Sequence, residues 1–330
     1  MVAKKDKMNF WLRLKKPFFV LAPLADVTDE AFRLIITKYG KPDVLWTEFT
    51  SADGLCDKEG REHLKINLMF SKKERPIVAQ LFSANPEKMR QASKYVASLG
   101  FDGIDINMGC PDRKIEKSGA GAALIKNPTL ARQIIEAAKD GIKLSGKNIP
   151  VSVKTRLGYG NDILDSWLPE LLREEVAAVT IHARTRKEMS DVPADWNRVQ
   201  GAVSIRNEMK SNALIIGNGD VRDLFEAQKR IEETGADGVM LGRAIFGNPW
   251  LFLKSQKAVS VSTKLNTMVE HAKLFEKLFK GLKNFAIMKK HFKAYASGFD
   301  GAKELRIKLM ETSGADEVAK ITKQFLKGLK

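Results

Sequence analysis

The stretch Gly103-Ile104-Asp105-Ile106-Asn107 is a short apolar run that breaks into a glycine-rich loop, Met108-Gly109-Cys110-Pro111-Asp112-Arg113-Lys114. Seven further runs have the same strand-like form, and they cover residues 18–22, 44–47, 77–81, 151–155, 178–182, 213–217 and 238–241. Helical patterns lie between the runs, among them residues 29–38, 86–99, 128–144 and 221–234. Several of these patterns open on Asp or Pro, as helices commonly do.

The alternation of strands and helices predicts the fold. Strands that are apolar along nearly their whole length and alternate with helices indicate a parallel sheet covered by helices. Eight such units within about 250 residues favour an α/β fold of the (β/α)8 TIM barrel type over an open doubly wound sheet.

The pattern changes after Leu253, where only helical stretches follow. They cover residues 266–283, 286–297, 302–312 and 315–329, with glycine-containing breaks between them. Their leucines recur at helical spacing, which is typical of a packed core with the lysines facing outward. We therefore predict a catalytic barrel at residues 1–254 and a small all-helical domain at residues 255–330.

The chain is strongly basic, with a formal net charge of +16. Residues 255–330 hold 16 Lys and Arg against 7 Asp and Glu, whereas residues 1–254 hold 40 against 33. A basic segment of this kind attracts polyanions, so the helical domain is a candidate nucleic-acid surface, with Lys289, Lys290 and Lys293 as contacts. A merely solvated lysine-rich surface is the alternative interpretation, because such surfaces are common.

Cysteine content and hydropathy bear on the compartment. Cys56 and Cys110 are the two cysteines, and two cannot build a disulfide framework. Basic residues interrupt the apolar residues of the N-terminal segment, unlike a secretory signal. No apolar run approaches the roughly 20 residues needed to span a bilayer. We expect a soluble, cytoplasmic monomer without a membrane segment or a metal site.

Polar side chains follow the predicted strands at the ends where barrel enzymes have their active sites. They are Gln80, Asn107, Lys154, Arg156, His182, Arg184, Asn218 and Arg243. Cys110 lies on the loop after one of these strands, among polar and basic neighbours. A lone cysteine is more often a small buried hydrophobe, but this setting favours a displayed and reactive thiol.

Two glycine-rich turns lie where the barrel fold usually binds phosphate, after the seventh and eighth strands. They are Gly217-Asn218-Gly219-Asp220 and Gly242-Arg243. Glycine allows backbone N–H groups to approach a phosphate, and the arginine adds a forked donor. The two turns therefore predict a phosphorylated ligand.

Lys154 and Arg156 are two residues apart on one predicted strand, so their side chains share the face that points into the barrel mouth. A lysine in this place could form a Schiff base, as in aldolases, or could stabilise the negative charge of a reduced flavin. A structural ion pair is a third interpretation. His182 could donate to a phosphate or to a flavin edge, although a lone histidine is often a core residue.

Six motifs follow one another along the chain: Ala22-Pro23-Leu24-Ala25-Asp26-Val27-Thr28-Asp29, Asn107-Met108-Gly109-Cys110-Pro111, Val153-Lys154-Thr155-Arg156, Ile181-His182-Ala183-Arg184-Thr185, Gly217-Asn218-Gly219-Asp220-Val221 and Gly242-Arg243-Ala244. In this order they resemble the motifs of the tRNA-dihydrouridine synthases, from roughly Phe18 to Trp250. Such a series is far more specific than any single motif. The resemblance implies an FMN-binding barrel, a helical domain that helps to hold tRNA, and NADPH-dependent reduction of a uridine to 5,6-dihydrouridine.

The resemblance also implies roles for the motif residues. Reduced FMN would pass hydride to C6 of a flipped-out uracil. Cys110 would deliver the proton to C5, since a thiol with a pKa of about 8.5 is mostly protonated at neutral pH. Asn107, Arg156 and Arg184 would contact the substrate. The residues implied to bind the cofactor are Ala22, Pro23, Leu24, Gln80, Lys154, His182, Asn218, Gly219, Asp220, Gly242 and Arg243.

The first motif departs from the family pattern at two positions, because Leu24 stands where Met is usual and Asp26 where Gly is usual. Leu is close to Met in volume, whereas Asp26 adds a charge. Three other functions fit parts of the pattern: a flavin barrel that reduces a small pyrimidine or enone, a non-flavin aldolase that uses Lys154, and an RNA-binding barrel without catalysis. A small substrate would not need the basic helices, and an inactive barrel would not need Cys110.

Overall fold

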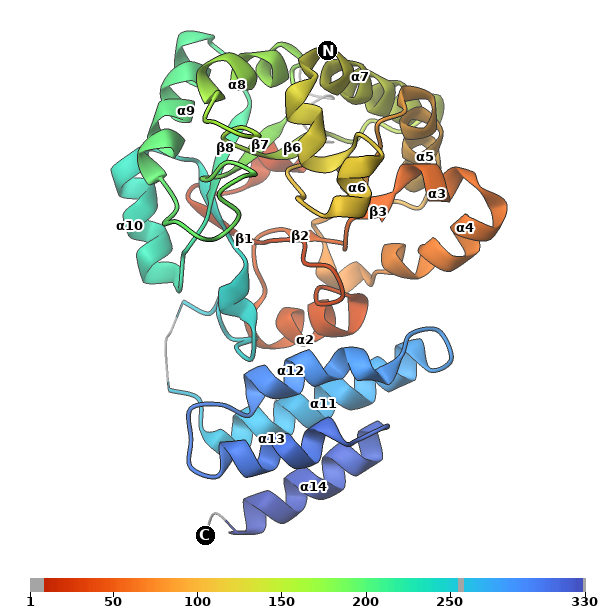
Figure 1. Ribbon diagram of the computed structural model, residues 1–330, viewed down its shortest axis with the longest axis vertical. Coiled ribbons are helices and arrows are strands. Elements are labelled where there is room, and N and C mark those ends of the chain that lie inside the picture. The colour runs from red at the N-terminus through yellow and green to blue at the C-terminus, as the bar shows by residue number, and fades with distance from the viewer. Residues whose placement is uncertain (1–8, 255–257, 329–330) are drawn as a thin grey trace. The chain divides into compact units, whose positions relative to one another are not determined.

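A computed structural model describes residues 9–254 and 258–328 of the chain (Figure 1). Parallel strands form one sheet, and they are β1 (Phe18–Leu21), β2 (Leu45–Trp46), β3 (Thr50–Ser51), β4 (Ile77–Phe82), β5 (Gly103–Met108), β6 (Val151–Arg156), β7 (Ala178–His182), β8 (Leu214–Asn218) and β9 (Gly238–Leu241). Their order is β1-β9-β8-β7-β6-β5-β4-β2, and the short β3 pairs with β4 beside this path. Val20 of β1 bridges Val44, directly before β2, so the sheet closes on itself. The predicted (β/α)8 barrel is confirmed.

The strands are apolar because a closed, helix-covered sheet buries both of its faces. In β5 every residue is buried, yet the two faces differ in chemistry. Ile104 and Ile106 alternate with Asp105 and Asn107, and the two polar residues hydrogen-bond to Gln80 of the neighbouring β4. One face of β5 therefore belongs to the apolar core, whereas the other forms part of a polar network inside the barrel.

The helices of the barrel are α3 (Ala52–Cys56), α4 (Lys58–Leu64), α5 (Pro86–Ser98), α6 (Arg113–Lys117), α7 (Pro128–Leu144), α8 (Leu164–Arg173), α9 (Trp196–Glu208) and α10 (Leu224–Thr234), with short 3-10 turns between some of them. α7 shows why they start where they do. The Asn127 side chain accepts the N–H of Leu130 at 3.1 Å, and Pro128 occupies the first turn. Gly141 lets α7 approach α5, because a side chain there would collide with the Arg90 carbonyl.

The contacts divide the chain into two compact units. The first contains the chain up to Pro23 and Asp43–Gly242, and the second contains Leu24–Pro42 and the chain from Arg243 onward. The helices of the second unit are α2 (Glu30–Gly40), η5 (Arg243–Ile245), α11 (Val261–Phe279), η6 (Phe285–Ile287), α12 (Met288–Tyr295), α13 (Ala302–Met310) and α14 (Ala315–Gly328). The boundary at residue 254 stays a prediction, as does the RNA-binding role of the predicted helical domain at residues 255–330, called here the tail.

The assignment of α2 to the second unit was not foreseen from the sequence, where residues 29–38 follow the first barrel strand. Phe32 of α2 stacks on His271 of α11, with ring centroids 5.0 Å apart. Tyr39 donates its hydroxyl hydrogen to Glu270 of the same helix, over 2.6 Å. In the part of the chain that the structure describes, no helix is both long and apolar enough to cross a membrane.

Candidate active site

The polar residues predicted at strand ends lie side by side at the C-terminal edge of the barrel sheet. The pairing register sets Asn107 of β5 opposite Lys154 of β6, and Arg156 of β6 opposite His182 of β7. His182 in turn lies opposite Asn218 of β8. Because neighbouring parallel strands end at the same edge, the structure brings these five side chains together.

The loop at residues 109–112, called here the Cys110 loop, leaves β5 at this edge. Asn107 Oδ1 accepts the backbone N–H groups of Gly109 at 3.1 Å and Cys110 at 2.9 Å. The Cys110 carbonyl accepts the N–H of Ala122 at 3.0 Å. Gly121 has φ +62°, and a Cβ there would lie 2.8 Å from the Cys110 carbonyl oxygen, so glycine is required at this close approach. The Cys110 loop is thus hydrogen-bonded both to Asn107, which precedes it in the chain, and to Ala122, which follows it.

Asn107 is predicted to contact the substrate, but its side-chain amide already makes three hydrogen bonds within the protein. Its Nδ2 donates to Gln80 Oε1 at 3.0 Å, and its Oδ1 already accepts two bonds. An amide offers two acceptor lone pairs and two hydrogens, so one Nδ2 hydrogen remains for a ligand. Contact with a uracil edge stays a prediction, limited to this single donor.

Arg156 is 6% exposed and bonds backbone rather than side chains. Its Nε donates to the Gly109 carbonyl at 2.7 Å, and its Nη1 donates to the carbonyls of Thr185 at 3.1 Å and Met189 at 3.3 Å. Burial lowers the pKa of this guanidinium to about 10. Arg156 therefore ties the Cys110 loop to the loop after β7, whereas its predicted contact with substrate stays a prediction.

The Cys110 thiol is half-buried. Burial raises the pKa of the thiol above its ordinary value of 9.0, although the nearby charges of Arg156 and Lys154 offset part of the effect. The thiol therefore keeps its proton at neutral pH, as a group that donates a proton must.

Lys154 is half-buried between β5 and β7. Its Nζ donates to Asn218 Oδ1 at 3.1 Å, and Asn218 Nδ2 donates to the Met240 carbonyl at 2.8 Å, which fixes the orientation of the amide. Burial lowers the pKa of Lys154 to about 8, and the charge of Arg156 adds to the effect. A lysine held by a neutral amide has donors and charge to offer to an anionic group.

His182, Arg184 and Asp220 form a second cluster at the same edge. Arg184 is 2% exposed and forms an ion pair with Asp220. Its Nη1 lies 3.3 Å from Nε2 of His182. Its Nε also donates to the Val192 carbonyl at 2.6 Å. Gly219, which directly precedes Asp220, has φ +136°, a conformation that favours glycine. A predicted substrate residue and a predicted cofactor residue therefore bind each other.

The remaining predicted site residues lie at two further places. Ala22 and Gly242 meet where β1 and β9 end: the Ala22 N–H donates to the Leu241 carbonyl at 2.8 Å, and Pro23, which follows, is buried. Leu24 and Arg243 belong to the second unit. There Leu24 opens a turn in which its carbonyl accepts the N–H of Thr28 at 3.0 Å.

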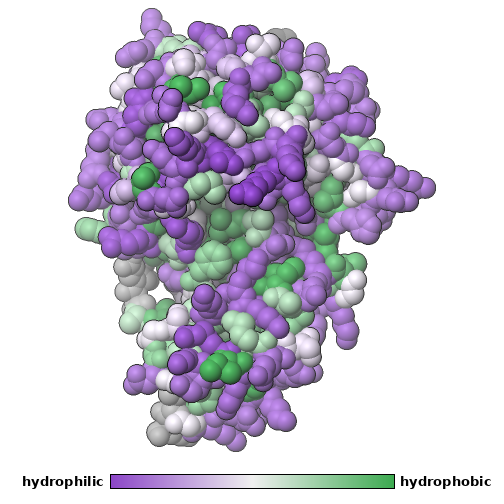
Figure 2. Space-filling model, in the orientation of Figure 1, coloured by the Kyte–Doolittle hydropathy of each residue, from purple (hydrophilic) through white to green (hydrophobic). Residues whose placement is uncertain are grey.

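Lys289, Lys290 and Lys293 lie on α12 in the second unit, where Lys289 is half-buried and the other two are exposed. Lys290 Nζ lies 3.8 Å from Asp26 Oδ2. Asp26 itself has φ +52°, in the left-handed region. On the face that Figure 2 shows, hydrophilic side chains cover most of the tail helices.

Asp105 and Ser152 belong to the site but were not singled out from the sequence. Both are buried, and Ser152 Oγ donates to Asp105 Oδ1 at 2.6 Å. A charged residue inside the apolar run at residues 103–107 was the available signal, because carboxylates are almost never fully buried without a partner.

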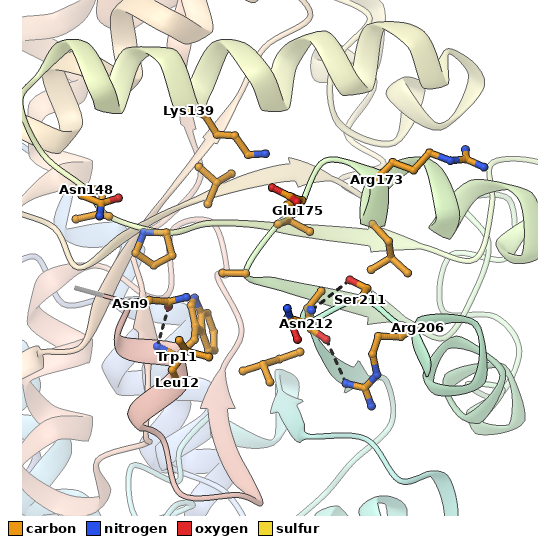
Figure 3. A pocket seen from close by; sticks show the side chains of 18 of the residues that line it. Asn9, Trp11, Leu12, Lys139, Asn148, Arg173, Glu175, Arg206, Ser211 and Asn212 are labelled. Atoms are coloured by element: carbon orange, nitrogen blue, oxygen red, sulfur yellow. Dashed lines mark hydrogen bonds between the residues drawn. The ribbon is translucent and has the colours of Figure 1, made fainter. Parts of the chain in front are cut away.

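The cavity drawn in Figure 3 lies at the opposite end of the strands. It has a volume of about 1740 Å³ and is lined by residues that precede β6, β7 and β8, including Pro150, Ala177 and Ala213. Figure 3 shows Arg173 and Arg206 beside it, from the ends of α8 and α9. Cations at helix C-termini stabilise the helix dipole, so these charges have a structural explanation.

Comparison with protein families and curated relatives gives a consistent result. The chain matches the family model described as "Dihydrouridine synthase (Dus)" over residues 20–329. It is 40% identical over 321 residues to the "Probable tRNA-dihydrouridine synthase" of Staphylococcus aureus (strain MRSA252), covering 97% of this chain and 96% of that one. It is 41% identical over 319 residues to the "Probable tRNA-dihydrouridine synthase 2" of Bacillus subtilis (strain 168), covering 96% of each.

Solved structures share the fold at low sequence identity. The old yellow enzyme homologue from Zymomonas mobilis aligns with a TM-score of 0.50 and 13% identity, over 74% of this chain and 91% of that one. A 2-naphthoyl-CoA reductase complex aligns with a TM-score of 0.52 and 11% identity, over 72% of this chain and 49% of that one. At such identities the likeness concerns the barrel fold alone.

Proposed function

This chain belongs to the dihydrouridine synthase family, and from that premise we propose that it reduces a uridine in tRNA to 5,6-dihydrouridine, with FMN as cofactor and NADPH as electron donor. It is a flavin oxidoreductase of the tRNA-dihydrouridine synthase type. The observation that carries the proposal is the half-buried Cys110 thiol on a loop whose backbone Asn107 and Arg156 hold at the barrel edge.

The residues at the barrel edge fit a phosphorylated flavin. Lys154 brings a positive charge, bonded to a neutral amide, that would stabilise the negative charge of the reduced flavin ring. The glycine at position 219 removes a side chain from the turn after β8, where the phosphate would lie. Together with Gln80, His182 and Asn218, these residues would hold the cofactor. When bound, FMN supplies the hydride that reaches uracil C6. Ala22, Pro23, Leu24, Asp220, Gly242 and Arg243 are the further residues proposed to line its site.

Cys110 would act as the acid on the other side of the double bond. Its thiol would donate a proton to uracil C5, and the resulting thiolate would be stabilised by the nearby charges of Arg156 and Lys154. Asn107 would offer its remaining amide hydrogen to the base. Arg184 already pairs with Asp220, so its proposed substrate contact would add to an existing ion pair.

The tail is proposed to hold the tRNA outside the barrel. Lys290 and Lys293 are exposed on α12 and can contact phosphates, whereas Lys289 is half-buried. A base in a folded RNA must be extruded before its ring can be reduced, which requires that the RNA be gripped elsewhere. Membership of the family disfavours the aldolase alternative and the reduction of a free small pyrimidine.

Incubation of the purified flavoprotein with NADPH and unmodified tRNA tests the proposal, with dihydrouridine measured by mass spectrometry of the digested RNA. We expect product with the native protein and with Cys56→Ala, whose half-buried thiol donates to the Lys88 carbonyl at 3.3 Å, away from the Cys110 loop. Cys110→Ala should lose product formation by about 10²–10⁴-fold, the usual contribution of a general acid. A protein without flavin, or a fully active Cys110→Ala variant, would refute the proposal.

A further inference from the structure

A chain of hydrogen bonds runs through the barrel interior and ends on the Cys110 loop. Ser152 Oγ donates to Asp105 Oδ1 at 2.6 Å, and Gln80 Nε2 donates to Asp105 Oδ2 at 2.7 Å. Asn107 Nδ2 then donates to Gln80 Oε1, and the Cys110 N–H donates to Asn107 Oδ1. Three neighbouring strands, β4, β5 and β6, therefore contribute to one network that ends at the backbone of Cys110.

The network is shielded from water. Gln80 and Asp105 are 0% exposed, Ser152 is 2% exposed and Asn107 is 5% exposed. A buried polar atom that loses its partner has no bulk water to replace it, so the loss of one bond is unfavourable. Each member of the network therefore depends on the next one.

The two ends of the network determine the direction of every bond in it. At the loop end the backbone N–H groups can only donate, and at the other end an ionised carboxylate can only accept. The amides of Gln80 and Asn107 lie between these ends. Either amide, turned over by 180°, would set donor against donor or acceptor against acceptor. An acceptor at position 105 is thus what completes the arrangement that holds Cys110.

An ionised carboxylate that is fully buried is unfavourable unless hydrogen bonds or nearby charges compensate for its desolvation. Burial raises the pKa of Asp105 to about 6, although the bonds from Ser152 and Gln80 and the charge of Lys154 offset part of the effect. The group is therefore still mostly ionised at neutral pH. An apolar side chain of similar size would avoid the desolvation of a charge.

We propose that Asp105 is a positioning residue, whose carboxylate orients the amides of Gln80 and Asn107 and thereby holds the backbone of Cys110 for proton delivery. Arg156 holds the same loop through the Gly109 carbonyl, so the two anchors act on opposite polar groups of one backbone turn. The inference rests on the proposed function, which assigns the Cys110 thiol as the proton donor.

Two variants of Asp105 separate the effect of losing a hydrogen-bond acceptor from the effect of losing the negative charge. Asp105→Leu keeps a similar volume and leaves Gln80 Nε2 without an acceptor. Asp105→Asn can still offer its Oδ1 to Gln80, with its Nδ2 directed at Ser152 Oγ, which can accept as well as donate. The intact flavoprotein is treated with iodoacetamide. The rates at which Cys110 and Cys56 are alkylated are then measured by mass spectrometry of the peptides that contain them. Cys56 serves as the reference thiol in the same sample.

In Asp105→Leu we expect the alkylation rate of Cys110 to change by about 10-fold, whereas that of Cys56 stays within about twofold. Dihydrouridine formation in a single turnover should fall by about 10²-fold, the usual loss when a reacting group is displaced by about 1 Å. Reduction of the flavin by NADPH does not involve the thiol, so its rate should fall far less than the single-turnover rate. Asp105→Asn should restore the native values within about threefold.

Native alkylation and native single-turnover rates in Asp105→Leu would overturn the proposal. Equal impairment of Asp105→Asn and Asp105→Leu would do so as well, because charge rather than an acceptor would then matter. If Asp105→Leu does not fold, Asp105→Ser replaces it, since a serine hydroxyl is too short to reach Gln80, and the same outcomes decide. If the native protein modifies no tRNA, the proposed function fails, whereas the alkylation comparison still decides the role of Asp105.

Discussion

Arg156 Nε donates to the carbonyl oxygen of Gly109 at 2.7 Å, so a residue at the end of β6 holds the Cys110 loop, which follows β5. The same guanidinium bonds the carbonyls of Thr185 and Met189 in the loop after β7. A planar group with five hydrogens can bond carbonyls in two loops at once. The sequence motif at residues 153–156 therefore has a structural function in addition to any contact with substrate.

Arg156→Lys should weaken both the fold and the reaction. A single ammonium cannot reach both loops with the same geometry, so the free energy of unfolding should fall by about 1–3 kcal/mol. Dihydrouridine formation should fall by at least about 10-fold because the Cys110 loop loses an anchor. Urea unfolding and single-turnover assays measure the two effects. Arg222→Lys is the control, because Arg222 is exposed on the surface and pairs with Glu226, and a native Arg156→Lys protein would contradict the prediction.

The rate of the reaction should depend on pH through Cys110. Since burial raises the pKa of this thiol above 9.0, the acid form persists at neutral pH and is lost only as the pH rises through the raised pKa. The single-turnover rate should therefore be level near neutrality and decline in alkaline solution. In Cys110→Ser the alkaline decline should disappear, because a hydroxyl does not ionise in this range, and the rate should be about 10²–10⁴-fold lower. Cys56→Ser should keep the native profile.

Lys154→Met should weaken the binding of FMN. Loss of a charged donor costs about 1.5–3 kcal/mol, which corresponds to an increase in Kd of about 10–150-fold. Titration of the flavin-free protein with FMN, followed by flavin fluorescence, measures the change. Lys143→Met removes an exposed lysine near the C-terminus of α7 and should leave the Kd unchanged. An unchanged Kd in Lys154→Met would place the flavin elsewhere.

His271 and His291 should make the protein less stable in acid. Both are 0% exposed, with ring centroids 4.6 Å apart. Burial lowers the pKa of His271 well below 6.5 and that of His291 to about 3. Between pH 6.5 and about 3 the unfolded chain therefore binds more protons than the folded chain, and the free energy of unfolding falls as the pH falls. Each histidine contributes a slope of about 1.4 kcal/mol per pH unit.

His271→Phe should remove one of these contributions while it keeps a ring against Phe32. Urea unfolding at several pH values between 7 and 4.5 should show a slope reduced by about 1.4 kcal/mol per pH unit. His63→Gln, at an exposed position in α4, should leave the slope unchanged. A slope in His271→Phe equal to the native one would show that the buried pair does not control acid stability.

Asp26 should limit the affinity of the tail for RNA, because its carboxylate lies 3.8 Å from Lys290. Asp26→Asn removes the charge and still tolerates the positive φ of this position. We expect tighter tRNA binding by a few-fold at low salt and a steeper dependence on salt. Lys290→Gln with Lys293→Gln should do the opposite, lowering the salt slope by about 1–2.

The control for this series is Lys229→Gln, since Lys229 is exposed on α10 and pairs with Glu233. Affinity is measured by fluorescence anisotropy of labelled tRNA across a salt series. Identical slopes in the native and the Lys290, Lys293 double variant would show that these lysines are only solvated surface.

The barrel could be predicted from the sequence because its signals are local. In β5, Ile104 and Ile106 alternate with polar residues, and a buried parallel strand needs such apolar runs whatever its partners are. The candidate site followed from the same logic, since Asn107, Lys154 and Asn218 each stand at the end of such a run. The strand-then-loop pattern placed Cys110 at the same edge, and the family resemblance implied its role as proton donor. The match over residues 20–329 confirms the family.

The sequence by itself therefore determined the strands apart from the short β3, the edge of the barrel that carries the polar residues, and the family. The tertiary structure alone decided which polar atoms meet: Lys154 with Asn218, 64 residues apart, and Gln80 with Asp105, 25 residues apart. It also decided that α2 packs on α11, through Phe32 and His271. Such partners depend on the register between strands and on the packing of distant helices. Propensity and periodicity describe only neighbours along the chain, so they carry no information about these pairings.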